Sequence, residues 1–257
     1  MRLLYYIACI GNPDLDIKTE ILISNLKYIY ADIQCKFDVC INLYEPYKST
    51  YDNLCNILNE FDFINHCYVY AKAGVLTELF LTNPHNKLVD NYDYIMFIMD
   101  DVKIFDMKLR EMTRIKERLN ISVISPKIIN STYTYMHIHN DVTINNFLEI
   151  YLLLLSPSDF NRFIGLYTIE NKWMWGIDLL FGHFNIKAGV VNKFTAIHML
   201  PSKSNKSDAQ ARLMTYINTH TPFKDPYAII QMYKAIAFQC DDMGENVKSI
   251  TLHENIL

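Results

Sequence analysis

Short apolar runs alternate with amphipathic segments through the first half of the chain. The runs have the length of a buried strand, and the segments between them repeat apolar residues at helical spacing, as at Leu22, Leu26 and Ile29. This β-α-β alternation favours a single-domain α/β fold with a doubly wound, mostly parallel sheet flanked by helices. The predicted strands cover 3–10, 37–43, 67–70, 94–99 and 122–125, and the predicted helices cover 15–30, 54–61, 75–81 and 107–119.

The pattern in the second half is less regular. We predict a main domain over residues 1–204 and a C-terminal helical extension, residues 205–257, packed on the same domain. The elements predicted here are a helix over 143–155, strands over 189–191 and 195–198, and helices over 209–240.

An acidic pair ends the fourth apolar run. The run 94–99 is unbroken and leads directly into Asp100 and Asp101. Open α/β sheets place ligands at the carboxyl ends of their strands, and a divalent cation with a phosphate ligand would stabilise two adjacent carboxylates. The alternative is a loop in which these residues cap a following helix. The pair therefore predicts either a metal site or a helix cap.

The chain has no glycine-rich phosphate motif. No G-x-G-x-x-G follows the first strand, and no G-x-x-x-x-G-K-[ST] occurs anywhere. With only 7 glycines in the chain, backbone amides are a poor cradle for a diphosphate. A metal held by the acidic pair would neutralise a diphosphate instead, as in nucleotide-sugar-dependent enzymes.

The composition argues against several classes of partner. The net charge is -4 and no segment mixes clustered Lys and Arg with aromatic residues, so we expect no nucleic acid. The apolar run 150–155 is far shorter than the roughly 20 residues of a membrane span. The 6 cysteines form no C-x-x-C pair, which favours reduced thiols. The sequence thus predicts a soluble, cytoplasmic protein.

Both tryptophans lie close to a carboxylate in the second half. Trp173 and Trp175 precede Gly176 and Asp178, and aromatic rings beside carboxylates suit sugars, which offer apolar C–H faces and hydroxyls together. The alternative is a buried aromatic helix start with Asp178 as its cap.

These segments, in this order, resemble small GT-A-like glycosyltransferases. The similar pieces are the run 92–102, the Trp-Gly-Ile-Asp-Leu stretch 175–179, and Val190-Val191 followed by His198. One such family carries Y-D-Y-I-F-L-W-D-D-D-[LI], a later W-G-[LI]-D and a terminal V-x-H, and small virus-encoded transferases acting on capsid glycans are similar. The stretch 70–74 resembles the donor side, and the likeness covers about 67–200. Met99 stands where the family has its first acidic residue.

The resemblance implies a divalent metal, Mn²⁺ or Mg²⁺, held by Asp101 first, then by Asp100 and His198. A strand-end histidine of the core is the alternative for His198. Asp178 would be the general base if the enzyme inverts the anomeric centre. If the enzyme retains configuration, Asp178 would position the acceptor or stabilise the cationic transition state.

The resemblance also implies a donor and an acceptor. The loop Ile10-Gly11-Asn12 would lie against the nucleotide base, Lys72 would pair with a donor phosphate, and Asp100 would contact the donor. Trp175 and Gly176 would bind a sugar. The implied reaction moves a hexosyl or deoxyhexosyl unit from a UDP- or GDP-linked sugar to a glycan or glycoprotein.

Two other functions stay open from the sequence. The departure at Met99 fits a catalytically inactive nucleotide-sugar binding module. A metal-dependent phosphohydrolase on a similar sheet is the third possibility.

Overall fold

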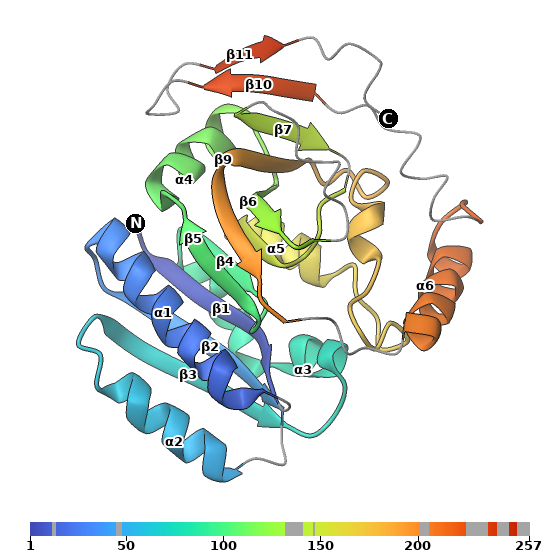
Figure 1. The fold of residues 1–257 in the computed structure, drawn as a ribbon. Helices are drawn as coiled ribbons and strands as arrows, with labels where there is room; N and C mark the ends of the chain where they lie inside the picture. Colours follow the sequence, from blue (N-terminus) through green and yellow to red (C-terminus); the bar gives the residue numbers. More distant parts are fainter. Residues whose placement is uncertain are drawn as a thin grey trace.

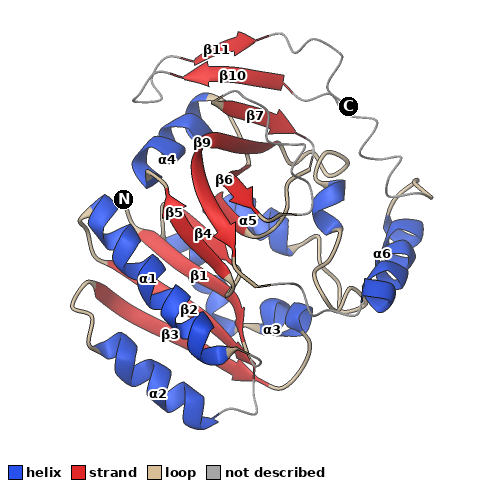
Figure 2. Ribbon diagram, in the orientation of Figure 1, coloured by secondary structure: helices blue, strands red, loops and turns tan. Residues whose placement is uncertain are grey.

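A twisted mixed sheet forms the centre of the protein, and helices cover both of its faces (Figures 1 and 2). The computed structural model describes residues 1–11, 14–44, 48–131, 141–145, 147–200, 206–224, 236–240 and 247–250. The strands are β1 (Leu3–Ile10), β2 (Phe37–Tyr44), β3 (Ile64–Lys72), β4 (Tyr94–Ile98), β5 (Val102–Asp106), β6 (Val123–Ile129), β7 (Val142–Asn145), β8 (Leu152–Leu155), β9 (Ala188–His198), β10 (Ile236–Cys240) and β11 (Val247–Ile250). The helices are α1 (Leu15–Ile33), α2 (Lys48–Asn59), α3 (Leu76–Thr82), α4 (Leu109–Arg118), α5 (Pro157–Ile164) and α6 (Lys206–His220), with 3-10 turns η1 (Pro84–Asn91) and η3 (Ile177–Leu180).

One half of the sheet is parallel. Strands β3, β2, β1 and β4 are neighbours in this order and run in one direction. Alternate residues of β1 enter two hydrophobic clusters, with Tyr5 and Ile7 in one and Tyr6 and Ala8 in the other. Helices α1, α2 and α4 supply the first cluster, and α3, α5 and α6 the second. Burial on both faces explains the apolar runs of β1, β2 and β4, whereas the edge strand β3 is partly exposed. The predicted single-domain α/β fold is confirmed.

The other half of the sheet adds antiparallel neighbours. The order continues from β4 through β8, β6, β9 and β7 to β10 and β11, and β5 pairs with β9. β8 runs antiparallel to β4, with Leu152 opposite Ile98, and β9 runs antiparallel to β5, with His198 opposite Val102. An antiparallel strand begins at the edge where its neighbour ends. The residues before β8 and the last residues of β9 therefore reach the edge where β4 ends.

Two predictions are wrong, and one alternative is excluded. The helix predicted over 143–155 is instead two strands, β7 and β8, because the four leucines of β8 are all buried in the sheet and Ser156 caps α5. Neither residue of the acidic pair caps a helix, since β5 follows directly. The segment predicted as helices over 209–240 contains α6, but it ends in β10, which pairs with β7. The boundary at 204 stays a prediction.

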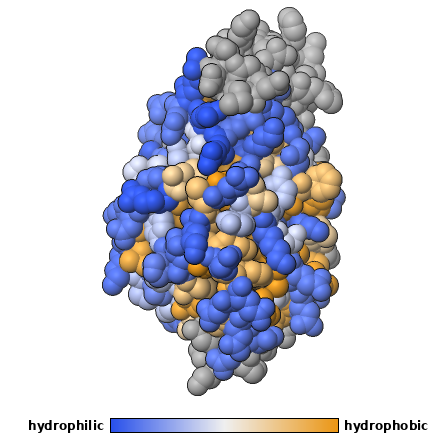
Figure 3. Space-filling model, turned by 90° about the vertical axis from the view of Figure 1, so that its left-hand side faces the viewer, coloured by the Kyte–Doolittle hydropathy of each residue, from blue (hydrophilic) through white to orange (hydrophobic). Residues whose placement is uncertain are grey.

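The apolar residues are concentrated inside the protein. On the face drawn in Figure 3, hydrophobic residues are interspersed with hydrophilic ones. None of the helices in the described ranges is long and apolar enough to cross a membrane. The cysteines at 9, 35, 40, 55 and 67 are free thiols, as the spacing predicted.

Candidate functional site

The acidic pair lies in the turn between β4 and β5, and backbone hydrogen bonds fix this turn from two sides. The N–H of Met99 donates to the carbonyl of Tyr151 over 2.9 Å. The N–H of Met199, just after β9, donates to the carbonyl of Asp101 over 2.8 Å. The turn is thus tied both to the segment before β8 and to the end of β9.

Asn25 holds the start of β5 from a third side. This residue is buried in α1, and its Nδ2 donates to the carbonyl of Val102 over 2.8 Å. Its Oδ1 accepts from the N–H of Ile104, also over 2.8 Å. A side-chain amide that satisfies two buried backbone groups leaves the strand little freedom to shift.

Asp101 faces His198. The carboxylate Oδ2 and the imidazole Nε2 are 3.0 Å apart, and the His198 side chain is only 9% exposed. The ring of Tyr151 packs against the imidazole with 4.5 Å between centroids. The hydrogen bond with Asp101 raises the pKa of His198 above its ordinary value, although burial opposes this. Imidazole and carboxylate thus form one oriented pair at the carboxyl edge of β4.

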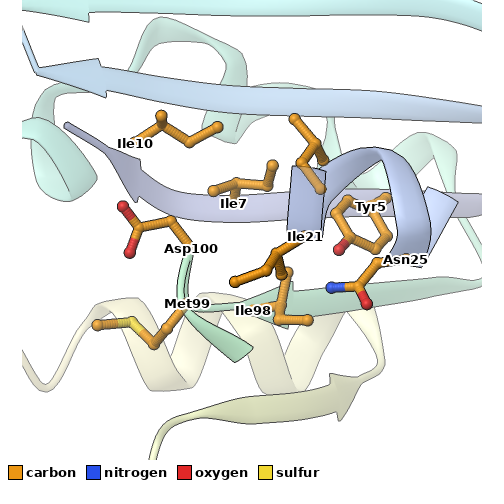
Figure 4. Close-up of a pocket in the computed structure, with 9 residues that line it drawn as sticks. Tyr5, Ile7, Ile10, Ile21, Asn25, Ile98, Met99 and Asp100 are labelled. Atoms are coloured by element: carbon orange, nitrogen blue, oxygen red, sulfur yellow. The ribbon is translucent and has the colours of Figure 1, made fainter. Parts of the chain in front are cut away.

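Asp100 faces the opposite way, toward the end of β1. Figure 4 shows it near Ile7 and Ile10, and these three residues help to line a small space of about 10 Å³. Its Oδ2 lies 2.8 Å from the Nζ of Lys18, and the backbone N–H of Gly11 donates to its carboxylate. Burial raises the pKa of Asp100 to about 6, with the charge of Asp101 adding to the rise and Lys18 opposing it. Asp100 and Asp101, although adjacent in the chain, therefore bind different partners, Lys18 and His198.

The Asp101–His198 pair fits a divalent cation. The carboxylate Oδ2 and the imidazole Nε2 are held 3.0 Å apart by the hydrogen bond between them, so a cation that replaced the shared proton would meet one oxygen and one nitrogen donor. Within the described ranges, no group of three or more His, Cys, Asp or Glu residues is arranged to hold a metal ion. The donor set is thus a carboxylate and an imidazole, which suits Mn²⁺, while Asp100 is turned to Lys18.

Asp178 and Glu149 are two further buried carboxylates that interact electrostatically. Asp178, on η3, and Glu149, before β8, are both 7% exposed. Burial raises the pKa of Asp178 to about 8, and the Glu149 charge adds to the rise. Glu149 also contributes to the raised pKa of His198, so it lies within electrostatic reach of both groups. Burial raises the pKa of Tyr167, and the Asp178 charge adds to the rise. The buried Tyr167 hydroxyl has no hydrogen-bond partner among the described residues.

The tryptophan segment is anchored to α3 and α6. The Oγ1 of Thr77 accepts from the N–H of Met174 over 3.0 Å, and the indole of Trp173 donates to Asp208 over 3.0 Å. Gly176 has a φ of +81°, which a residue with Cβ adopts only with strain, and a Cβ there would clash with Leu213 of α6. This turn leaves Trp175 41% exposed while Asp178 is buried.

The residues predicted for the donor side lie in different parts of the structure. Ile10 is fully buried, so only its backbone could meet a ligand. Gly11 lies at the acidic pair through its bonds to Asp100 and Lys18, while Asn12 falls outside the described residues. Lys72 ends β3, which is separated from β4 by two strands, and it pairs with Glu78 over 2.7 Å. The structure does not bring Lys72 to the acidic pair.

Sequence reasoning missed three residues of this site. Lys18 stands in the first turns of α1, directly after the strand end that was predicted to carry ligands. Glu149 and Tyr151 fell inside the wrongly predicted helix. The signal for both was the run of four leucines followed by Ser156 and Pro157, which is typical of a buried strand leading into a capped helix.

Comparison with known proteins identifies the fold. No protein-family model and no curated protein matches the chain. Among solved structures, GalNAc-T7 with UDP, GalNAc and Mn²⁺ matches with a TM-score of 0.56 and 8% identity, over 84% of this chain and 48% of that one. S. aureus TarS 1–349 matches with a TM-score of 0.59 and 10% identity, over 89% and 68%. The same fragment in complex with UDP gives 0.55 and 11%, over 89% and 68%.

Identities this low show the fold alone, and the chain spans about half the length of the GalNAc-T7 structure. Membership of the small family in the sequence resemblance, and its viral relatives, stay predictions. The protein has a GT-A-like fold, the fold of nucleotide-sugar glycosyltransferases.

Proposed function

We propose that the protein is a nucleotide-sugar-dependent glycosyltransferase. It would move a hexosyl or deoxyhexosyl unit from a UDP- or GDP-linked donor to a glycan or glycoprotein acceptor, with Mn²⁺ or Mg²⁺. The observation that carries this proposal is the Asp101–His198 pair, 3.0 Å apart at the carboxyl end of β4 in a GT-A-like sheet. UDP is the favoured nucleotide because structures that share the fold contain it.

Asp101 and His198 are the residues proposed to hold the metal. When bound, a divalent cation neutralises charge on the diphosphate leaving group. The turn carrying Asp101 is fixed by Asn25 and by the end of β9, so the pair is oriented before any ligand arrives. Gly11 is the proposed donor-side backbone contact, and Lys72 is left out because Glu78 pairs with it.

Asp178 is the proposed general base toward the acceptor. A carboxylate is a weak base at its ordinary pKa, and burial beside Glu149 raises the pKa of Asp178 to about 8, near the working range of a base. Trp175 and Gly176 are proposed for the sugar side, because the turn at Gly176 exposes the indole while Asp178 stays buried.

A screen of nucleoside diphosphate sugars for Mn²⁺-dependent hydrolysis tests this function. We expect release of the nucleotide from at least one donor, loss in Asp101→Asn and Asp178→Asn, and normal release in the control Asp106→Asn, an exposed carboxylate at the far end of β5. Nucleotide binding without any turnover would favour the inactive binding module, which the departure at Met99 also fits. No hydrolysis and no metal-dependent binding of any donor would overturn the proposal.

A further inference from the structure

Lys18 and Asp100 form a closed network with the end of β1. The Nζ of Lys18 lies 2.8 Å from Asp100 Oδ2 and donates to the carbonyl of Gly11 over 3.1 Å. The N–H of Gly11 donates back to the Asp100 carboxylate. One ammonium group, one carboxylate and one peptide unit therefore connect α1, β1 and the turn after β4.

This network is shielded from water. The side chain of Lys18 is 15% exposed and that of Asp100 is 13% exposed. Removing one partner from a shielded pair leaves the other charge uncompensated, so separating the two side chains costs free energy. A metal that recruited Asp100 would have to break this pair as well as bind the carboxylate.

The side chains of the two aspartates therefore contact different partners. Asp101 is directed at His198 on β9, whereas Asp100 is directed at Lys18 on α1. Backbone hydrogen bonds at Met99, Asp101 and Val102 fix the turn, so Asp100 can join Asp101 at a metal only if its side chain leaves Lys18.

We propose that Lys18 is a positioning residue that keeps Asp100 out of the metal site and ties Gly11 to the turn after β4. Asp101 is then the one carboxylate of the acidic pair that binds the metal, and the Lys18–Asp100 pair holds the donor-side backbone. This inference rests on the proposed nucleotide-sugar function and adds to it a role for Lys18 that the sequence did not assign.

Mn²⁺ titration, followed by the electron paramagnetic resonance signal of the free ion, tests the division between the aspartates. We expect Asp100→Asn to keep the Mn²⁺ affinity within about threefold of wild type and Asp101→Asn to lower it by about 30-fold or more. Lys18→Met frees Asp100 to join the metal, so the affinity should rise several-fold, and this rise should disappear in the double variant Lys18→Met/Asp100→Asn.

UDP binding in the presence of Mn²⁺ tests the positioning role. We expect Lys18→Met to weaken UDP binding by about tenfold and Lys18→Arg, which retains the charge, to restore most of it. A misfolded variant would lose Mn²⁺ and UDP together, whereas opposite changes in the two affinities mark a positioning residue.

Equal losses of Mn²⁺ affinity in Asp100→Asn and Asp101→Asn would overturn the inference while leaving the glycosyltransferase proposal in place. So would unchanged affinities for both ligands in Lys18→Met. Failure of the wild-type protein to bind either Mn²⁺ or UDP would instead overturn the proposed function itself.

Discussion

The parallel half and the mixed half of the sheet bring residues to the same edge by different routes. In the parallel half, Asp100 and Asp101 simply follow the strand that ends there. In the mixed half, Glu149 and Tyr151 precede β8, and His198 ends β9. The comparison teaches that a site at one edge of a mixed sheet draws on strand ends and strand beginnings alike.

The largest expected effect comes from removing Asp101, which follows β4, or His198, which ends β9. Asp101→Asn and His198→Ala remove one member each from a pair that acts as a unit, so each should lower kcat/KM by about 100-fold or more. The double variant should be little worse than either single variant, because the effects of one unit do not add. Steady-state kinetics with the responsive donor measures this. Fully multiplicative losses would mean that the two residues act separately.

The acceptor side should show a pH dependence of its own. Asp178 acts as a base once it has lost its proton, so activity should rise as the pH passes through about 8. Since the Glu149 charge helps to raise the pKa of Asp178, Glu149→Gln should move this rise to lower pH. A pH profile of kcat for wild type and Glu149→Gln measures the shift, and identical profiles would remove Glu149 from the site.

The same carboxyl group should affect stability. Between the ordinary pKa of 3.8 and about 8, the folded state holds a proton on Asp178 that the unfolded state has released. Stability should therefore fall as the pH rises through this window, by up to about 1.4 kcal/mol per pH unit from this group. Urea unfolding at several pH values measures the slope. Asp178→Asn should flatten it, and an unchanged slope would contradict the assigned burial effect.

The smallest expected effects concern Asn25, which holds the acidic turn, and Thr77, which holds the tryptophan segment. Asn25→Ala leaves the carbonyl of Val102 and the N–H of Ile104 without their partner, which should cost about 2 kcal/mol. Thr77→Ala removes a hydroxyl that donates to the carbonyl of Asn171 and accepts from the N–H of Met174. Because that N–H also donates to the Asn171 carbonyl, the loss should be smaller, about 1 kcal/mol. Thermal unfolding compares the two. A larger loss in Thr77→Ala would mean that the acceptor side, and not the acidic turn, is the more tightly held.

The sequence predicted β1, β2 and β4 of the parallel half well because these three strands are buried on both faces. Such strands form continuous apolar runs, so 3–10, 37–43 and 94–99 could be located nearly to their ends. A family resemblance, and not the chain pattern, put Asp101 and His198 in one metal site; the two side chains lie 3.0 Å apart, and their role as metal ligands stays a prediction. Chain pattern alone does not reveal that β9 returns antiparallel to β5 and brings His198 opposite Val102.

What could not be predicted depends on side-chain direction and on strand partners. Consecutive residues of a strand point to opposite faces, yet Asp100 and Asp101 lie in a turn, where this alternation gives no guidance. Their separate partners, Lys18 and His198, are 82 and 97 positions away along the chain. The helix predicted over 143–155 failed for a related reason, since a short apolar run fits a buried strand or a helix equally well.

Calorimetric binding of UDP to the wild-type protein and to Asp101→Asn, each with and without Mn²⁺, tests the central claim most directly. We expect Mn²⁺ to tighten UDP binding to the wild type by about tenfold or more and to leave the UDP affinity of Asp101→Asn nearly unchanged. Equal UDP affinity with and without Mn²⁺ in the wild-type protein would contradict it.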